Sequence, residues 1–105
     1  MNKDLKEFLD NFVEELKKMD VFNITLINTP DYLTDYFVIG SVDNTVTLKA
    51  IVDKFRGVKV HGQPESGWVI LDFGDFWCHI FLPETREYYN IERLWNLRSV
   101  IKQAK

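Results

Sequence analysis

Two apolar segments, residues 68–73 and 76–82, are separated only by the pair Gly74-Asp75. Runs of this length that are rich in aromatic and branched side chains are typical of β-strands. A Gly followed by one other residue can form a two-residue reverse turn between antiparallel strands. The sequence therefore predicts a β-hairpin here, and alternate side chains of its strands must face a core.

In the second strand of this hairpin, successive side chains point to opposite faces of the sheet. The more uniformly apolar set is expected to face the core, and it consists of Phe76, Cys78, Ile80 and Leu82. The other set is expected to lie under a helix or at a binding face, and it consists of Trp77, His79 and Phe81.

Helices are expected in three places. Apolar residues recur at spacings of three and four between Leu5 and Met19, which predicts an amphipathic helix. A second helix is expected after Asp43 or Asn44, either of which can cap its first turn. Its predicted buried face consists of Val46, Leu48, Ala50, Ile51, Val52 and Phe55. Pro83 is expected to open a helical turn, and a last helix is expected to pack Leu94, Leu97 and Ile101 inward.

Three further strands are expected at residues 22–27, 36–39 and 58–60. In the first of them, Phe22, Ile24 and Leu26 alternate with Asn23, Thr25 and Ile27. This alternation predicts a strand with one face more buried than the other. The order of elements predicts an α+β (mixed α/β) fold with a single domain over residues 1–105. We expect a mixed sheet of about five strands flanked by helices, with at least one right-handed parallel crossover.

The net charge of −3 argues against broad, charge-driven binding of nucleic acid, which needs a basic face. The charge is uneven, however, because residues 91–105 carry a net charge of +3. This basic C-terminal segment either makes a minor contact with RNA phosphates at the edge of an interface or is a solvated helix face. Its basic residues are Arg93, Arg98, Lys102 and Lys105.

The single cysteine, Cys78, cannot form an intramolecular disulfide, which fits a reducing compartment. The N-terminal residues lack the apolar region of a secretory signal. No apolar run approaches the roughly 20 residues of a membrane span. We therefore expect a soluble, cytoplasmic protein without a membrane partner.

Three blocks of the sequence have a distinctive order and spacing. They are LTDYFVIGS at residues 33–41, WVILDFGD at residues 68–75 and HIFLPETREYYNIERLW at residues 79–95. Together they resemble the pattern of the ribosomal silencing factor family, also called Iojap-like proteins. Two departures accompany the resemblance. Val46 stands near the position where the family has an Arg, and residues 55–68 form a shorter segment than the family's.

The resemblance implies a fold similar to that of nucleotidyltransferases and a function without turnover. Members of the family bind the large ribosomal subunit through its protein numbered fourteen, block joining of the small subunit and repress translation. No cofactor is implied. The expected partner-binding residues are Trp68, Asp72, Asp75, Trp77, Tyr88, Tyr89 and Glu92.

Each of these residues also has a structural alternative. Trp68 can cap the core, and the two aspartates can serve the turn, where Asp is common. Arg86 is expected to pair with either aspartate. The spacing of Tyr88, Glu92 and Trp95 predicts that they share one helix face, although Trp95 can equally pack on the sheet.

Two other functions remain open at this point. Gly40-Ser41 followed later by Asp72 and Asp75 resembles the pattern of metal-dependent nucleotidyltransferases, which hold two metal ions on paired aspartates. The chain would then be such an enzyme or its inactive relative. The other alternative is a homodimeric module that uses its exposed aromatic residues.

We expect neither catalysis nor a metal site. The carboxylates of Asp72 and Asp75 need not converge across a turn, and adjacent residues of a strand, such as Cys78 and His79, cannot chelate one ion. His61 with His79 lacks the ligand spacing of a zinc site.

Overall fold

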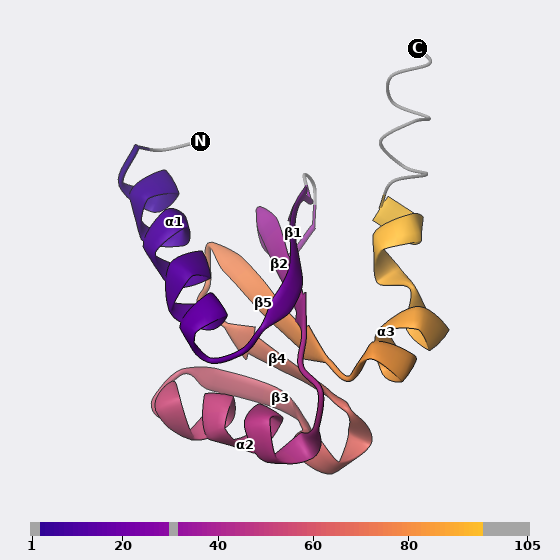
Figure 1. The fold of residues 1–105 in the computed structure, drawn as a ribbon. Helices are drawn as coiled ribbons and strands as arrows, with labels where there is room; N and C mark the ends of the chain where they lie inside the picture. The colour runs from indigo at the N-terminus through magenta and orange to yellow at the C-terminus, as the bar shows by residue number, and fades with distance from the viewer. Residues whose placement is uncertain (1–2, 30–31, 96–105) are drawn as a thin grey trace.

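The computed structural model describes residues 3–29 and 32–95, which form a single five-stranded sheet with helices on both sides (Figure 1). The helices are α1 (Lys3–Lys18), α2 (Thr45–Lys54), the short 3₁₀-helix η1 (Pro64–Ser66) and α3 (Pro83–Tyr89). The strands are β1 (Phe22–Asn28), β2 (Tyr36–Ser41), β3 (Lys59–Gln63), β4 (Trp68–Asp72) and β5 (Phe76–Phe81). No helix of the described ranges is long and apolar enough to cross a membrane.

The strands lie in the order β1-β2-β5-β4-β3, and only the pair β2–β5 is parallel among the four pairings. The predicted hairpin is β4–β5, in which the Phe73 amide donates to the Phe76 carbonyl at 3.0 Å across Gly74-Asp75. Gly74 has a φ of 90° there, which a residue with a side chain rarely adopts. The expected mixed α+β fold is confirmed.

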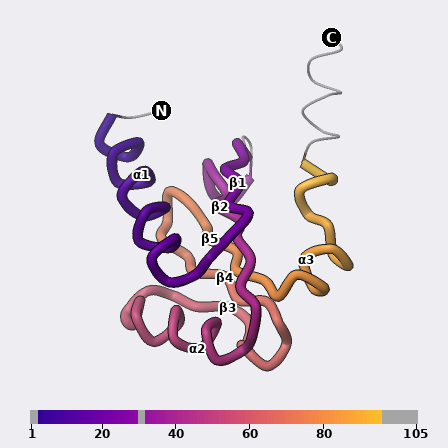
Figure 2. The backbone as a smooth tube through the Cα atoms, in the orientation of Figure 1, coloured from indigo at the N-terminus to yellow at the C-terminus, as the bar shows by residue number. Residues whose placement is uncertain are grey.

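The two faces of the sheet are covered differently. Helices α1 and α3 lie on opposite sides of it (Figure 2). The core on the α1 and α2 side joins apolar residues of both helices to the sheet: Leu9, Phe12, Leu16, Leu48, Ile51, Val38, Val69, Leu71, Cys78 and Ile80. The opposite side, which we call the open face, holds a smaller core: Ile27, Phe37, Ile39, Phe81 and Trp95.

Both side-chain sets of β5 are therefore buried. Cys78 and Ile80 face the larger core, as expected. His79 and Phe81 are equally inaccessible, at 3% and 0% exposure, because the rings of the smaller core surround them. Only Trp77 of the second set stays partly exposed.

Strand β1 departs from the predicted alternation. Its register with β2 shifts between Phe22 and Thr25, and Asn23 adopts a φ of 53°. A bulge of this kind changes which side chains point inward beyond it. As a result Ile27 is buried, whereas Leu26 is 49% exposed.

Helix α2 begins at the expected place. Asn44 rather than Asp43 caps it, because the Asn44 Oδ1 accepts a hydrogen bond from the Thr47 amide at 2.8 Å. Leu48 and Ile51 are buried as predicted. Val46 is 77% exposed, and Ala50 is exposed too, because both lie on the side of the helix away from the sheet.

Helix α3 ends earlier than the sequence pattern predicts. Asn90 adopts the left-handed conformation, with φ 46° and ψ 51°, and residues 91–95 then resume a helical path in a new direction. The predicted face shared by Tyr88, Glu92 and Trp95 is therefore wrong. Trp95 is 7% exposed in the smaller core, and Leu94 is 61% exposed rather than packed inward. Leu97 and Ile101 lie outside the described residues.

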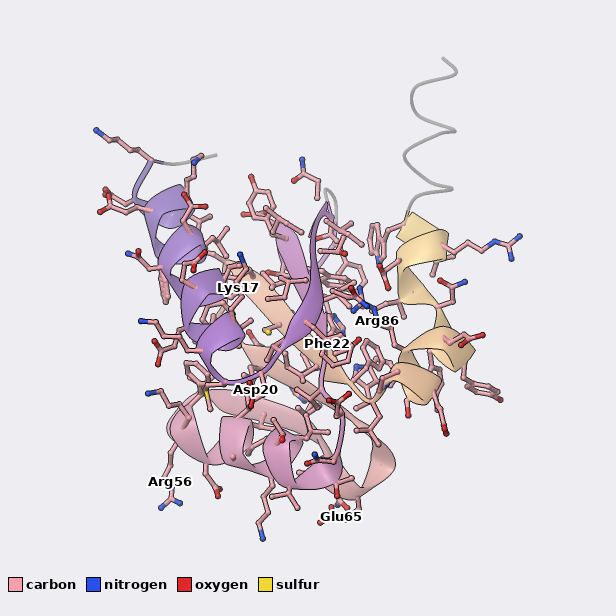
Figure 3. All side chains as sticks on the ribbon, viewed as in Figure 1. Lys17, Asp20, Phe22, Arg56, Glu65 and Arg86 are labelled. Carbon is pink, nitrogen blue, oxygen red and sulfur yellow. The ribbon has the colours of Figure 1, made fainter. Side chains whose placement is uncertain are left out.

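The turn at Asn90 places Glu92 against Arg86. The Arg86 Nε donates to Glu92 Oε1 at 2.7 Å, and Nη2 donates to Oε2 at 3.0 Å. Nη1 donates to the Ser41 hydroxyl at 2.8 Å, so that the guanidinium ties α3 to β2 (Figure 3). The predicted pairing of Arg86 with Asp72 or Asp75 is wrong, because those residues flank the start of β5 whereas Arg86 follows its end.

We expect Glu92→Ala to lower the free energy of unfolding by roughly 1–3 kcal/mol, because it leaves a mostly buried guanidinium without its carboxylate. The Arg86 side chain is only 12% exposed and that of Glu92 25%. The matched control is Asp10→Ala, which breaks an ion pair with Lys6 whose side chains are both 68% exposed. That control is expected to change stability by less than about 0.5 kcal/mol. Urea denaturation followed by circular dichroism measures the free energy of unfolding of both variants. Equal losses of stability would contradict a stabilising role for the ion pair between Arg86 and Glu92.

His79 is the buried titratable group of the open face. Burial lowers its pKa from 6.5 to about 4, because the charged imidazolium is costly among aromatic rings. Its Nε2 is buried and has no hydrogen-bond partner among the described residues. The imidazole is therefore neutral in the folded protein at physiological pH.

This pKa shift predicts a loss of stability in mild acid. Between the unfolded pKa near 6.5 and the folded pKa near 4, the unfolded chain binds the extra proton, so stability falls as the pH falls through this range. From pH 7 to pH 5 the contribution of His79 is on the order of 2 kcal/mol. Denaturation at both pH values is expected to show a smaller difference for His79→Leu than for the original protein. His61→Gln is the control, and a His79→Leu protein with an unchanged pH dependence would refute the assignment.

Candidate functional site

The register of the sheet places three of the seven predicted binding residues on the open face. Residues that pair directly across neighbouring strands point to the same side. Trp68 pairs with Phe81, and Asp72 pairs with Trp77. The structure therefore brings Trp68, Asp72 and Trp77, three of the residues predicted to bind a partner, to one surface.

Helix α3 covers only part of this surface. The Tyr89 ring lies 4.8 Å from that of Trp68, and the Trp68 ring stacks on Phe81 with a centroid separation of 4.9 Å. Tyr88 lies edge-on to Tyr89 at 5.0 Å and is 82% exposed. We call the group Trp68, Ile70, Trp77, Tyr88 and Tyr89 the aromatic surface.

A shallow pocket of about 240 Å³ opens within the aromatic surface. Its lining includes Trp68, Ile70 and Tyr89 together with His61 and Ser66. The walls come from β3, β4, η1 and the end of α3. A pocket bounded by half-buried aromatic side chains is suited to accept an apolar or aromatic side chain of a partner.

Trp68 is held in place from below. Its Nε1–H donates to the His79 Nδ1 at 3.2 Å. The low pKa of His79 keeps Nδ1 free to accept this bond, since a protonated imidazole has no acceptor. The indole is therefore fixed in one orientation before any partner arrives, which reduces the entropy that binding must offset.

Asp72 is occupied by the hairpin. Its Oδ1 accepts a hydrogen bond from the Gly74 amide at 2.8 Å, and its Oδ2 lies 3.9 Å from His61 Nε2. The alternative in which this aspartate serves the turn is therefore realised. Its side chain is still 20% exposed beside Trp77, so it also forms part of the rim of the aromatic surface.

Two predicted binding residues lie elsewhere. Asp75 is at the tip of the hairpin, where its backbone carbonyl accepts from the Asp35 amide at 3.3 Å. Its side chain borders a different hollow, together with Asp4 and Tyr36. Glu92 is bound to Arg86 and lines a different hollow, together with Phe22 and Ser41. Neither joins the aromatic surface.

Two further residues of the open face were not predicted to bind a partner: Ile70 was assigned no role, and His61 was considered only as a metal ligand. Both lie in the central row of the open face, where His61 pairs with Ile70 and Ile70 with His79. Alternation within residues 68–72 places Ile70 on the same face as Trp68, so the sequence could have indicated Ile70. The position of His61 could not be inferred from the sequence, because residues 59–63 have little apolar pattern and do not reveal the register of β3.

The features that suggested a nucleotidyltransferase do not assemble into a phosphate site. Gly40 and Ser41 belong to β2 rather than to a turn after it, and both are buried. A Cβ at position 40 would lie 2.4 Å from Val21 Cγ1, so the space above it is filled. The Ser41 hydroxyl already accepts from Arg86. Within residues 3–29 and 32–95, no group of three or more His, Cys, Asp or Glu residues is placed to hold a metal ion.

Known structures and sequences give an independent view of the chain. A crystal structure of a protein from Chromobacterium violaceum superposes with a TM-score of 0.72 at 29% identity, covering 87% of this chain and 85% of that one. A second, from Bacillus halodurans, has a TM-score of 0.64 at 25% identity, covering 86% of this chain and 94% of that one.

Among curated proteins, the chain is 39% identical over 105 residues to the mouse protein "Mitochondrial assembly of ribosomal large subunit protein 1". This match covers 87% of this chain and 46% of the mouse protein. It is 36% identical over 72 residues to the ribosomal silencing factor of Zymomonas mobilis, with 60% and 54% covered. The chain thus spans about half the length of these two relatives. For the silencing factor of Bacillus subtilis the identity is 30% over 95 residues, with 82% and 75% covered.

The family described as "Ribosomal silencing factor during starvation" matches residues 2–105, nearly the whole sequence. The match includes all three blocks that carried the resemblance and every strand of the sheet. The chain therefore belongs to the ribosomal silencing factor family.

Proposed function

We propose that this protein binds the large ribosomal subunit through the aromatic surface and obstructs joining of the small subunit, which represses translation. The proposed contact is the large-subunit ribosomal protein numbered fourteen. Family membership supports a ribosomal role, and the mouse relative is named for assembly of the large ribosomal subunit. The mechanism requires binding and bulk rather than chemistry.

The observation that carries the proposal is the exposed, pre-ordered aromatic surface. Tyr and Trp are the residues most enriched among those that dominate binding energy, particularly where they surround a small pocket. Here Tyr89 is 51% exposed and rests on Trp68, which is fixed by His79.

The remaining parts of the expectation stay predictions. A minor contact of the basic C-terminal segment with RNA depends on Arg98, Lys102 and Lys105, which lie outside the described residues. The cytoplasmic location and the homodimeric alternative are likewise predictions. A homodimer that used the aromatic surface would compete with the ribosome for that surface. Sedimentation of the protein alone, which reports whether it is a monomer or a dimer, therefore distinguishes the two alternatives.

Co-sedimentation with separated large and small subunits at moderate salt tests the proposed function. Saturable binding to large subunits alone is the expected result. A subunit-joining assay by light scattering is then expected to show inhibition that follows the occupancy of the large subunit. Binding without inhibition would refute the obstruction mechanism, and absence of binding would refute the proposal as a whole.

The Tyr89→Ala variant is expected to weaken large-subunit binding about tenfold, because an exposed aromatic anchor is removed. The fold is expected to persist, since Tyr89 is the last residue of α3 and half exposed. Trp68→Ala is expected to weaken binding at least as much and also to lower stability, because it breaks the bond to His79. The matched control is Phe8→Ala on the other side of the sheet, where the ring is 44% exposed. If Tyr89→Ala binds as tightly as Phe8→Ala, the aromatic surface is not the contact.

A further inference from the structure

The imidazole of His79 has one polar atom that packing does not account for. The residue is 3% exposed, and its Nε2 has no hydrogen-bond partner among the described residues. Its Nδ1 accepts the Nε1–H of Trp68 at 3.2 Å. A neutral imidazole carries a single ring proton, so Nδ1 can accept this bond only when the proton is on Nε2. The unpartnered atom is therefore a donor, and burying it lowers the stability of the fold.

An apolar side chain would suit this position better if packing alone decided it. The His79 ring lies 4.4 Å from the Phe37 ring and is stacked 6.2 Å from that of Phe81. A Leu among these rings would leave no buried donor without a partner. Burial also lowers the pKa of His79 to about 4, so at neutral pH the ring forms no ion pair that could offset its cost. Within residues 3–29 and 32–95, the one hydrogen bond of this side chain is the bond to Trp68.

This bond decides which edge of the Trp68 indole faces outward. Rotation about the bond between Cβ and the ring offers an aromatic side chain roughly two orientations. The rings of Phe81 and Tyr89 contact the indole at 4.9 and 4.8 Å, but apolar contacts of this kind have little directional preference. The hydrogen bond is directional and turns the N–H edge toward the buried His79. The carbon atoms of the indole are left to line the pocket of the aromatic surface.

We propose that His79 is a positioning residue for partner binding, which holds Trp68 in the orientation that forms the pocket wall and lowers the stability of the fold in doing so. The inference rests on the proposed function, because its readout is affinity for the large ribosomal subunit. It also specifies the partner's side chain. Since the indole N–H is already bonded within the protein, the partner meets only carbon atoms of Trp68, and an apolar side chain is their complement.

Two substitutions of His79 separate stability from binding. His79→Leu removes both the acceptor and the unpartnered donor. The urea midpoint at pH 7 is therefore expected to stay or to rise, whereas large-subunit affinity falls about two- to tenfold because Trp68 must be ordered on binding. His79→Asn keeps an acceptor, Oδ1, at the branch where His has Nδ1, but it leaves a cavity. It is expected to be less stable than His79→Leu and yet to bind more tightly. Affinity that follows stability in these two variants would overturn the proposal.

A double-mutant cycle with Trp68→Phe isolates the hydrogen bond. Phe has no N–H, so His79→Leu is expected to weaken binding less than about twofold in the Trp68→Phe background. An equal loss of affinity in both backgrounds would also overturn the proposal. The control is Ile51→Val in the larger core, on the other side of the sheet, which is expected to lower stability and leave affinity unchanged.

Hydrogen exchange of the indole N–H tests the bond in the protein without ribosomes. Nuclear magnetic resonance resolves the N–H signals of the three Trp residues, and the signal of Trp68 is the one absent from Trp68→Phe. It is expected to exchange about tenfold faster in His79→Leu. Unchanged exchange would overturn the positioning role even if the protein binds large subunits. Protected exchange in a protein that fails to bind would instead overturn the proposed function, and with it the effect on affinity, so the two failures are distinguishable.

Discussion

The parallel pairing of β2 with β5 holds the two halves of the molecule together. It runs through six residue pairs, from Tyr36 with Phe76 to Ser41 with Phe81. Every other pairing joins neighbours within one half, β1 with β2 or β3 with β4 and β5. Strands that are covered on both faces need apolar residues at nearly every position, and both strands have them. This requirement explains why residues 36–39 and 76–82 form runs that are apolar at every position except His79.

The same requirement explains why the aromatic surface lies where it does. The smaller core protects β2 and half of β5 on the open face, and Trp95 and α3 complete that cover. Helix α3 ends at Tyr89 and does not cover β3 and β4 on the open face. The aromatic and polar side chains of these two strands therefore face solvent there. His79 sits at this boundary. His79 itself is buried, with an exposure of 3%. It nevertheless accepts the hydrogen bond of Trp68, which lies in the partly exposed part of the open face.

The sequence predicted those features that depend on short, repeated patterns. The hairpin at Gly74-Asp75, a cap at Asp43 or Asn44 and an amphipathic helix between Leu5 and Met19 follow from side-chain chemistry within a few residues. Three features could not be predicted in this way. The bulge at Asn23 and the turn at Asn90 each depend on one Asn in the left-handed conformation, which Asn tolerates but does not require.

The third feature, the partner of Arg86, depends on the second. Without the turn at Asn90, Glu92 would continue along α3 beside Tyr88. With the turn, Glu92 folds onto the guanidinium of Arg86. The hairpin aspartates lie at the other end of β5, a separation that the sequence alone does not reveal. The sequence pattern therefore indicated the position of a side chain correctly where alternation within a strand decided it, as for Trp68 and Trp77 on the open face. It failed where a single backbone conformation decided the position, as for Glu92. Binding by any of these residues stays a prediction.

The distribution of charge at the aromatic surface limits the kind of contact that this surface can make. The described residues form there an aromatic patch with few charges on one side of the sheet. Because His79 is neutral and Asp72 is bound by the turn, shape and apolar contact are left to decide affinity at this patch. The proposed obstruction of subunit joining needs only such a fixed body, held at one face.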